Sequence, residues 1–455
     1  MRPTSLTTFK TFYILLITQT ISMLGSSMTA FAIGVWLFLE TGKTTPLMLV
    51  AFFSWLPRMV LGGVAGVFAD RLNRRMLIML GDAGQAVPTL LLAIVFATDT
   101  FQVWHLYAAA LVQSFFGMMQ GPAFMASVTM LVPEDHRTRA NAIIEISGPL
   151  AGMTAPVLGG MLYAVVGITG VIIIDLATFL LAVGVAWLVH IPQPTRTAES
   201  QATQGSVWQE LRGGYQFLAS RRGLFYVSLY FMFLNFITTG IWRLMTPYML
   251  VLTDSERTVG LLQGISSAGL VIGGLIPIVW QGTRTKIHTI FPTLMWAAVG
   301  LIIFGMVRTP LGLGIAVFLM MLPYKFNNAL LHSIQQAKIP PDMQGRVYGL
   351  IGQISIFAMP ITYLVTGPIV DKGLEPAVGG EHWHWVDGLV GNQAGAGIGL
   401  YIMVCGALLL VASVLVYALP VVRHVERDLP DYKPEPRQEQ ETSPIGMEQA
   451  VAGAI

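Results

Sequence analysis

Long apolar runs dominate the pattern of hydrophobic and polar positions along this chain. A helix needs about 20 mostly apolar residues to cross a bilayer. Twelve segments of this kind follow one another, at about 11–38, 46–69, 76–97, 102–132, 141–166, 169–190, 223–252, 258–280, 288–307, 311–336, 347–370 and 396–420. These segments do not alternate apolar with polar residues, as the strands of a membrane barrel do. The pattern predicts an all-α integral membrane protein with twelve transmembrane helices.

The composition supports the same class. Charged residues make up 11% of the 455 residues, against about 25% in soluble proteins, and the mean hydropathy is +0.66. A soluble fold could not bury so much apolar surface, which excludes a cytosolic enzyme, a nucleic-acid binder and a disordered chain. The single cysteine, Cys405, excludes an internal disulfide and metal sites built from cysteines. We expect no metal and no cofactor.

The distribution of basic residues predicts the orientation. With the N-terminus inside, 19 of the 26 Lys and Arg residues fall in inside segments and four in outside loops. Cytoplasmic loops carry such an excess. The expected location is the plasma (inner) membrane of the cell, with several passes and both termini cytoplasmic.

The chain divides into two halves of six helices. We expect an N-terminal bundle over 1–190, a cytoplasmic linker over 191–222, a C-terminal bundle over 223–420 and a disordered cytoplasmic tail over 421–455. Within the linker, apolar residues at helical spacing between Val207 and Leu218 fit either a short interfacial helix or the start of the next span.

The two halves repeat each other. Residues 62–75 align without gaps on 273–286, and 133–139 align on 340–346, at offsets of 211 and 207. A duplication around a central loop is typical of transporters whose substrate site lies between two halves.

The loop after the second span carries a charged motif made of Gly66, Asp70, Arg71, Asn73, Arg74 and Arg75. Asn73 is one of the few residue types other than Gly that tolerates a left-handed turn. Asp70 can accept hydrogen bonds from arginine and face the positive end of a helix, and so hold the cytoplasmic side shut. The alternative is that the three arginines only anchor the topology.

At this motif the sequence resembles the major facilitator superfamily, whose signature has Gly where this chain has Asn73. The second-half copy has Gln281 at the Asp position. Further matches resemble the branch of macrolide efflux pumps and enterobactin-type siderophore exporters, also described as drug:proton antiporter-like or transmembrane secretion effectors. They include Gln19, Ser22, Gly25, Asp82, Gln120, Asp175, Gly345 and Arg346. The resemblance implies a pseudo-two-fold arrangement of six plus six helices, transport, and efflux as the direction.

The fifth span presents small residues at close spacing. Gly152, Pro156, Gly159 and Gly160 resemble the antiporter signature of the superfamily, with Ala155 in place of its first Gly. The resemblance implies that this motif seals a helix pair against leak. Ordinary close packing of small residues in a membrane is the alternative.

Six ionisable residues fall inside spans, where each must pair or face a cavity: Arg58, Asp82, Glu145, Asp175, Arg243 and Lys325. Asp82, Glu145 and Asp175 are the candidates for carrying a coupling proton, and structural ion pairs are the alternative. Arg58 and Lys325 are candidates for attracting an anionic substrate. Arg243 lies close enough to the outer edge to extend its charge toward water.

These features favour a monomeric secondary transporter over an enzyme, since no catalytic triad, metal motif or nucleotide motif is present. We expect export of amphipathic small molecules, of the drug, macrolide or siderophore class, by alternating access driven by the proton gradient. A lysophospholipid or lipid flippase and a nutrient importer of the same fold are the alternatives. The expected partners are the small-molecule substrate and membrane lipid, with no nucleic acid.

Overall fold

Helices form the whole regular structure of the described residues in the computed structural model. The structure describes residues 5–429 apart from 72, 134–135, 190–211, 213–214, 281 and 340. Nine stretches within these residues are long and apolar enough to cross a membrane. The chain is therefore a multi-pass membrane protein, as the apolar pattern predicts.

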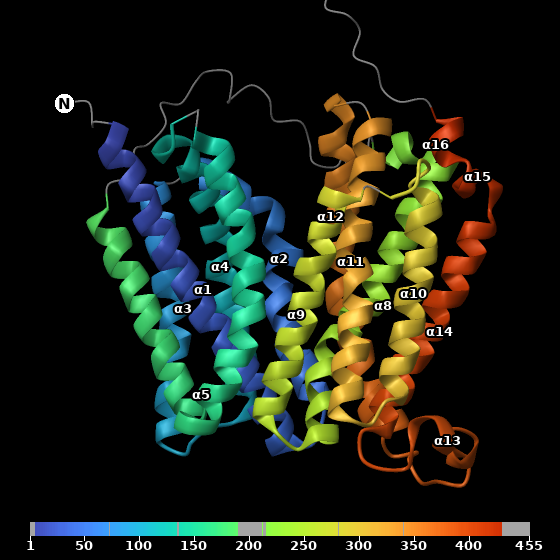
Figure 1. The fold of residues 1–455 in the computed structure, drawn as a ribbon. Coiled ribbons are helices and arrows are strands. Elements are labelled where there is room, and N and C mark those ends of the chain that lie inside the picture. The colour runs from blue at the N-terminus through green and yellow to red at the C-terminus, as the bar shows by residue number, and fades with distance from the viewer. Residues whose placement is uncertain are drawn as a thin grey trace, which may run out of the picture.

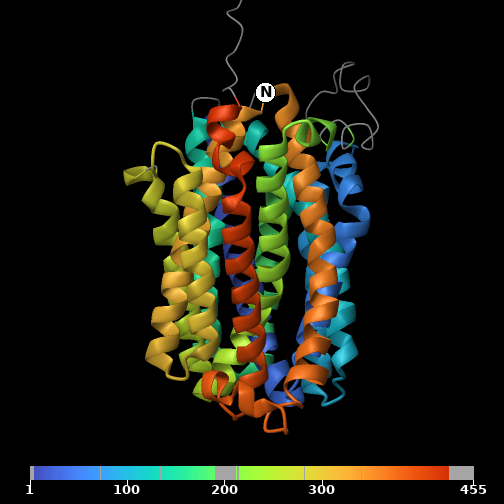
Figure 2. The same ribbon diagram turned by 90° about the vertical axis from the view of Figure 1, so that its right-hand side faces the viewer.

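Two bundles of helices stand side by side, with their axes close to vertical in both views (Figures 1 and 2). The first bundle contains α1 (Ser5–Thr41), α2 (Thr45–Arg71), α3 (Arg74–Ala97), α4 (Val103–Leu131) and α5 (Arg137–Leu188). The second contains α8 (Arg222–Thr253), α9 (Glu256–Val279), α10 (Ile287–Met306), α11 (Pro310–Lys338), α12 (Pro341–Pro368) and α14 (Ala396–Ala418).

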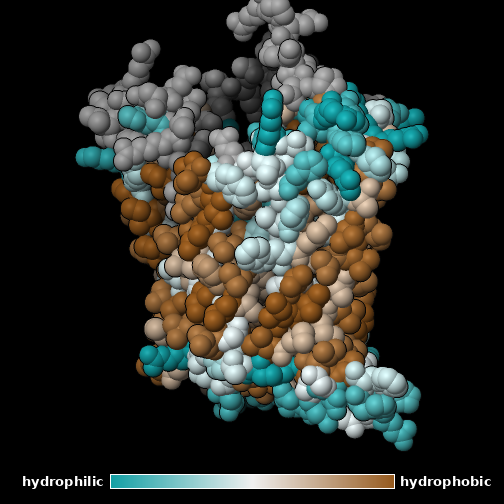
Figure 3. Space-filling model, turned by 45° about the vertical axis from the view of Figure 1, so that its right-hand side comes forward, coloured by the Kyte–Doolittle hydropathy of each residue, from teal (hydrophilic) through white to brown (hydrophobic). Residues whose placement is uncertain are grey.

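Short elements connect and close the second bundle. They are η2 (Ile369–Leu374), η3 (Trp383–Trp385), α13 (Asp387–Val390), α15 (Pro420–Arg423) and α16 (Val425–Asp428). We call the end of the molecule that carries the α1–α2 connection the first-loop end, drawn at the bottom of Figure 1, and the opposite end the terminal end. A broad hydrophobic belt separates hydrophilic side chains at these two ends on the face seen in Figure 3.

Helix α5 is two crossing segments joined at a bend. Gly167 has φ 66° and ψ −176°, which is not helical and which a residue with a side chain rarely adopts. On one side of the bend Ile172 packs with Leu37 and Leu106 near the first-loop end. Further along, Ala186 packs with Phe12 and Leu77 at the opposite end. Counting α5 as two segments gives six crossing helices in each half.

Local capping explains several helix starts. The side chains of Asn73, Ser255 and Thr309 accept hydrogen bonds from backbone amides in the first turns of α3, α9 and α11. The expected left-handed turn at Asn73 is wrong, because this residue is extended, with φ −64° and ψ 118°. Its side chain is used as a helix cap instead.

The predicted boundary of the C-terminal tail at residue 421 is too early. Helices α15 and α16 occupy 420–428, and Val422 and Val425 are almost fully buried. The Glu426 carboxylate accepts a hydrogen bond from the Ile287 amide at 2.9 Å, and Lys338 donates to the Glu426 carbonyl oxygen at 2.7 Å. These contacts fold the start of the tail onto α10 and α11. Residues 430–455 and most of the proposed linker helix lie outside the described residues.

Close packing of α9 on α11 depends on one of two adjacent glycines. A Cβ atom added to Gly273 would lie 2.1 Å from the Leu322 carbonyl oxygen, whereas one added to Gly274 would meet only Lys325 Cβ at 3.8 Å. Backbone cannot yield as a flexible side chain can, so the two positions differ sharply in tolerance.

We expect Gly273→Ala to destabilise the protein and Gly274→Ala not to. Overpacking in Gly273→Ala should lower the free energy of unfolding by roughly 1–3 kcal/mol. This loss outweighs the gain of about 1 kcal/mol in helix stability from replacing Gly by Ala. Thermal unfolding in detergent compares the two variants directly, and equal midpoints would contradict the packing argument.

Candidate functional site

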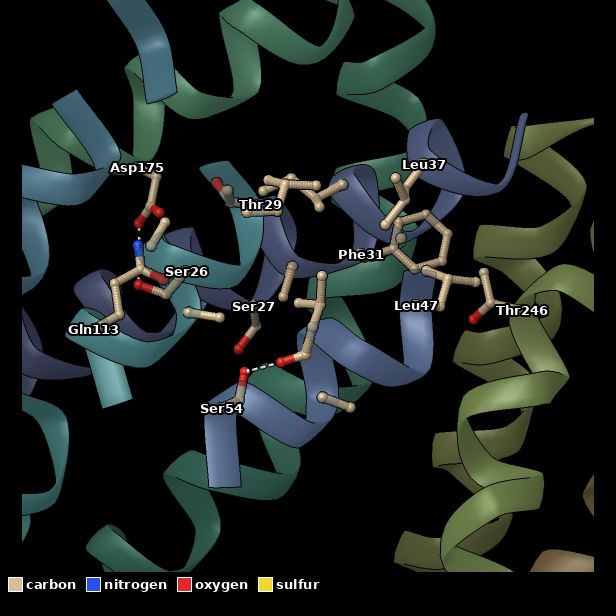
Figure 4. A pocket seen from close by; sticks show the side chains of 18 of the residues that line it. Ser26, Ser27, Thr29, Phe31, Leu37, Leu47, Ser54, Gln113, Asp175 and Thr246 are labelled. Atoms are coloured by element: carbon tan, nitrogen blue, oxygen red, sulfur yellow. Dashed lines mark hydrogen bonds between the residues drawn. The ribbon is translucent and has the colours of Figure 1, made fainter. Parts of the chain in front are cut away.

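A cavity of about 410 Å³ lies between the two halves and is lined by both. Its wall comes from α1, α2, α3, α4 and α5 on one side and from α8 and α9 on the other. Figure 4 shows Ser26, Ser27 and Asp175 on the side of the first half and Thr246 of α8 across from them. Apolar side chains such as Phe31 and Leu47 line the same space. The cavity therefore offers both polar and apolar contacts.

A second cavity of about 520 Å³ lies within the first half. It shares five wall residues with the central cavity: Ser26, Ser27, Ala30, Gln85 and Phe179. The two volumes are therefore neighbours, and together they have the size of an ordinary small-molecule site.

Asp82 is held in a network of amides on the wall of the second cavity. It accepts hydrogen bonds from Gln19 Nε2 at 2.7 Å and from Gln120 Nε2 at 2.6 Å. Gln120 Oε1 in turn accepts from Gln85 Nε2 at 2.7 Å. The Asp82 side chain is only 1% exposed, so amide donors replace the water that a buried carboxylate loses.

Asp175 is the buried carboxylate in the wall of the central cavity. Ser26 Oγ donates to Asp175 Oδ1 at 3.0 Å, and the side chain is 1% exposed. Gly25 allows α1 to approach, because a Cβ there would lie 2.5 Å from Thr178 Oγ1 and 3.1 Å from Asp175 Oδ1. Asp175 thus lies where α1 and α5 are in close contact, in a cavity that both halves share.

Unlike the buried carboxylates, the arginines of the two cavities are exposed. Arg58 of α2 lines the second cavity and Arg243 of α8 the central one, and both are exposed. Arg58 lies 5.3 Å from the ring of Trp55, and Arg243 lies 6.0 Å from the ring of Tyr363. Within the described part of the chain neither guanidinium has a carboxylate partner.

The two halves meet closely near the first-loop end, through α5 and α9. A Cβ on Gly160 would lie 3.0 Å from the Glu256 carbonyl oxygen, and one on Gly260 would lie 2.7 Å from the Pro156 carbonyl oxygen. Gly159 faces α1 instead, where a Cβ would lie 3.1 Å from the Met28 carbonyl oxygen. Further along, Ser267 Oγ donates to the Gly152 carbonyl oxygen at 3.1 Å. The small residues of the fifth span thus form a contact between halves.

A carboxylate joins the halves on the other side of this end. Asp371, in η2 of the second half, accepts hydrogen bonds from the Thr44 amide and hydroxyl, both at 2.8 Å, and from the Thr45 amide at 2.6 Å. Thr45 begins α2, so Asp371 caps a helix of the opposite half, where negative charge is favoured. Gly367 brings the same helices together, since a Cβ there would lie 2.8 Å from Thr45 Cα.

Comparison with known proteins agrees with this architecture. The model of the family described as "Major Facilitator Superfamily" matches residues 15–363, most of the chain. The chain belongs to the Major Facilitator Superfamily. It is a membrane transporter and not an enzyme.

Relatives within the superfamily include efflux pumps. Macrolide efflux protein A of Streptococcus pyogenes is 24% identical over 385 residues, which cover 83% of this chain and 92% of that protein. Multidrug efflux pump Tap of Mycolicibacterium fortuitum is 25% identical over 362 residues, covering 74% of this chain and 83% of the pump. These likenesses agree with the macrolide-efflux part of the branch indicated by the span motifs.

Solved structures of other superfamily members share the fold. An inward-facing, unoccupied bacterial homologue of the human lysosomal transporter Spinster superposes with a TM-score of 0.72 at 13% identity, covering 96% of this chain and 100% of that one. The nucleoside transporter NupG gives a TM-score of 0.67 at 14% identity, over 90% of this chain and 99% of that one. At such identities the likeness concerns the fold alone.

The superfamily loop motif is only partly described in this transporter. Arg75 Nε donates to the Ala186 carbonyl oxygen at 3.0 Å, and its Nη2 donates to the Trp187 carbonyl oxygen. A cation at these carbonyls complements the end of α5. Arg74 also has an interaction partner. Gly66, Asp70 and Arg71, as well as Glu145, Gly345, Arg346 and Gln281, lie outside the residues whose side chains are described.

The structure separates the two basic residues proposed to attract a substrate. Arg58 lines the second cavity, whereas Lys325 is absent from the lining of both the central and the second cavity. In the second half, Arg243 is the basic residue that lines the central cavity. Gln85 and Asp371 were not among the residues predicted from the sequence. A glutamine inside an apolar span was a usable signal for Gln85, but the partner of Asp371 lies 326 residues away.

We expect Asp371→Asn to open the first-loop end more often. Replacing a charged acceptor of three hydrogen bonds should cost the closed arrangement about 1–3 kcal/mol, and each 1.4 kcal/mol changes a two-state ratio about tenfold. Double electron–electron resonance between labels on Asp99→Cys and Glu381→Cys, in a Cys405→Ser background, should show a larger population of long distances. Asp387→Asn, an exposed carboxylate at the same end, is the matched control. An unchanged distance distribution in Asp371→Asn would contradict the role of this cap.

Proposed function

We propose that this transporter exports amphipathic small molecules across the plasma (inner) membrane by alternating access coupled to proton entry. The proposal rests on a cavity shared by both halves, next to the contacts that close the first-loop end. We call these contacts, at Gly160, Gly260 and Asp371, the seam. The names of the efflux-pump relatives support the direction of transport. The excess of basic residues at the terminal end supports a cytoplasmic location for that end and for both termini.

The seam assigns a physical role to the small residues of the fifth span. Backbone contact at Gly160 and Gly260 excludes water and small solutes from the first-loop end while the cavity holds a substrate from the other side. Rocking of the halves would break these contacts together with the Asp371 cap, and would expose the cavity to the outside. Resistance to leak in this state is what an exporter requires.

Two buried carboxylates, Asp82 and Asp175, lie in the cavity walls and are candidates for carrying the coupling proton. The geometry favours Asp175 as the coupling group, because it lies in the cavity shared by both halves and accepts from Ser26. Asp82 is held by two glutamine amides inside one half, which suits a structural role. Glu145 remains a third candidate. The proton gradient supplies the energy, so the proposed mechanism uses no cofactor. The transporter is proposed to act as a monomer.

The test uses everted membrane vesicles energised to hold an acidic interior. Macrolides, dyes, catecholate siderophores and lysolipids are added one at a time, and the pH gradient is followed by dye quenching. We expect a compound of this panel to release protons only when the protein is present. Compound-dependent lipid flipping without proton release would favour the flippase alternative, and silence across the panel with inserted, folded protein would contradict the proposal.

We expect Asp175→Asn to abolish the substrate-triggered proton release while the protein still inserts and binds substrate. An amide cannot carry the transported proton, so the loss should exceed about tenfold. Asp254→Asn, in the loop before α9, is the matched control and should release protons normally. Normal release by Asp175→Asn would exclude this residue, and normal release by the Asp82→Asn and Glu145→Gln variants as well would exclude the whole set.

A further inference from the structure

The two cavities expose positive charge and hide negative charge. Their charged wall residues are Arg58, Asp82, Asp175 and Arg243. Both carboxylates are 1% exposed and accept hydrogen bonds from neighbouring side chains. Both arginines line the cavities, and among the described residues each guanidinium lies near an aromatic ring and has no carboxylate partner. A ligand entering this space therefore meets two cations and no free carboxylate.

The arginines lie at similar depths on opposite halves. Arg58 is 13 residues from the start of α2 and Arg243 is 10 residues from the end of α8, both counted from the first-loop end. At about 1.5 Å per residue these positions correspond to roughly 20 and 15 Å along the helices. An arginine at mid-depth of a membrane is costly unless it is paired, and it marks a substrate pathway when it faces a cavity.

We propose that Arg58 and Arg243 form the cationic contacts of a binding site for amphipathic anions, which deepens and rests on the proposed export function. The planar guanidinium binds a carboxylate, sulfonate or phosphate through paired hydrogen bonds. Phe31, Leu47 and Trp242 supply apolar surface for the rest of the ligand, and Ser27 and Gln85 add neutral polar groups to the wall. Each arginine lines one of two neighbouring cavities, and the proposed site extends over both.

The same chemistry can come from a water-soluble acid or from an anionic lipid. A water-soluble acid would be recognised at the guanidiniums and enter from the aqueous side of the cavity. An anionic lysolipid carries its phosphate on a single long acyl chain and would enter from the bilayer. Competition between one probe of each kind separates the two sources.

The experiment measures binding to the purified full-length protein in phosphatidylcholine nanodiscs, without a proton gradient. The probes are N-dansyl-leucine, which carries a carboxylate, and N-dansyl-leucinamide, its neutral counterpart. Energy transfer from tryptophan to dansyl reports binding, with empty nanodiscs as the background. We expect the carboxylate probe to bind at least about tenfold more tightly than the amide, since a charge-assisted pair outweighs a neutral contact.

Arginine variants identify the contacts. Arg58→Gln and Arg243→Gln should each weaken binding of N-dansyl-leucine about tenfold and leave the amide unchanged, and the double variant should lose the discrimination. Arg423→Gln is the matched control, because Arg423 also lies beside an aromatic ring, Tyr417 at 5.1 Å, but belongs to α15 outside the cavities. Displacement of the dansyl acid by oleoyl-lysophosphatidylglycerol, but not by unlabelled N-acetyl-leucine, would assign the site to lipid.

The proposal is overturned if the two probes bind equally, or if the arginine variants weaken both probes alike. Its failure differs from failure of the export function, because binding is measured without transport. Proton-coupled export of a neutral or cationic compound together with no preference for the dansyl acid would retain the function and reject the anion site. Strong preference for the dansyl acid, together with no proton release in the vesicle assay, would retain the anion site and reject the export function.

Discussion

Close backbone contact between the two halves at the first-loop end is the constraint on which the rest of this structure depends. Gly160 and Gly260 allow α5 and α9 to touch, and Gly367 does the same for α2 and α12. Asp371 adds a directional contact, because its carboxylate caps a helix of the opposite half. In a bilayer the hydrophobic effect does not drive helices together, so small residues stabilise the interface by allowing close packing. The charged cap fixes how the two halves align. The central cavity is lined by both of these halves.

Polar groups inside the cavities follow two different rules. Carboxylates are surrounded: Asp82 by Gln19 and Gln120, and Asp175 by Ser26. The two guanidiniums lie near aromatic rings and have no carboxylate partner among the described residues. Buried charge is tolerated in hydrocarbon when hydrogen-bond donors or acceptors replace water. The carboxylates already have such partners, whereas the guanidiniums would gain them from a bound anion. This asymmetry is the basis of the proposed preference for anionic substrates.

Most of the fold could be predicted from the sequence, because crossing a bilayer requires apolar runs of fixed length. The spans agree with the helices, and Gly167 separates two of them as the break in the apolar pattern indicates. The site was predictable only in part. Asp82, Asp175 and Arg58 are visible as charges in apolar segments, but pairing is not. The positions of Arg243 and Lys325 depend on helix rotation, which neither charge nor depth determines. Asp371 was missed because a loop carboxylate gives no sign of a distant partner.

The most direct test of the account asks from which side the cavity is reached. Ser27 lines both cavities and can carry the only reactive thiol as Ser27→Cys in a Cys405→Ser background. A membrane-impermeant maleimide is added to oriented vesicles on one side at a time, without substrate or gradient. We expect rapid labelling from the side of the terminal end and labelling at least about tenfold slower from the first-loop side, because the closed seam must open first. Faster labelling from the first-loop side, or equal rates from both, would contradict a seam closed at that end.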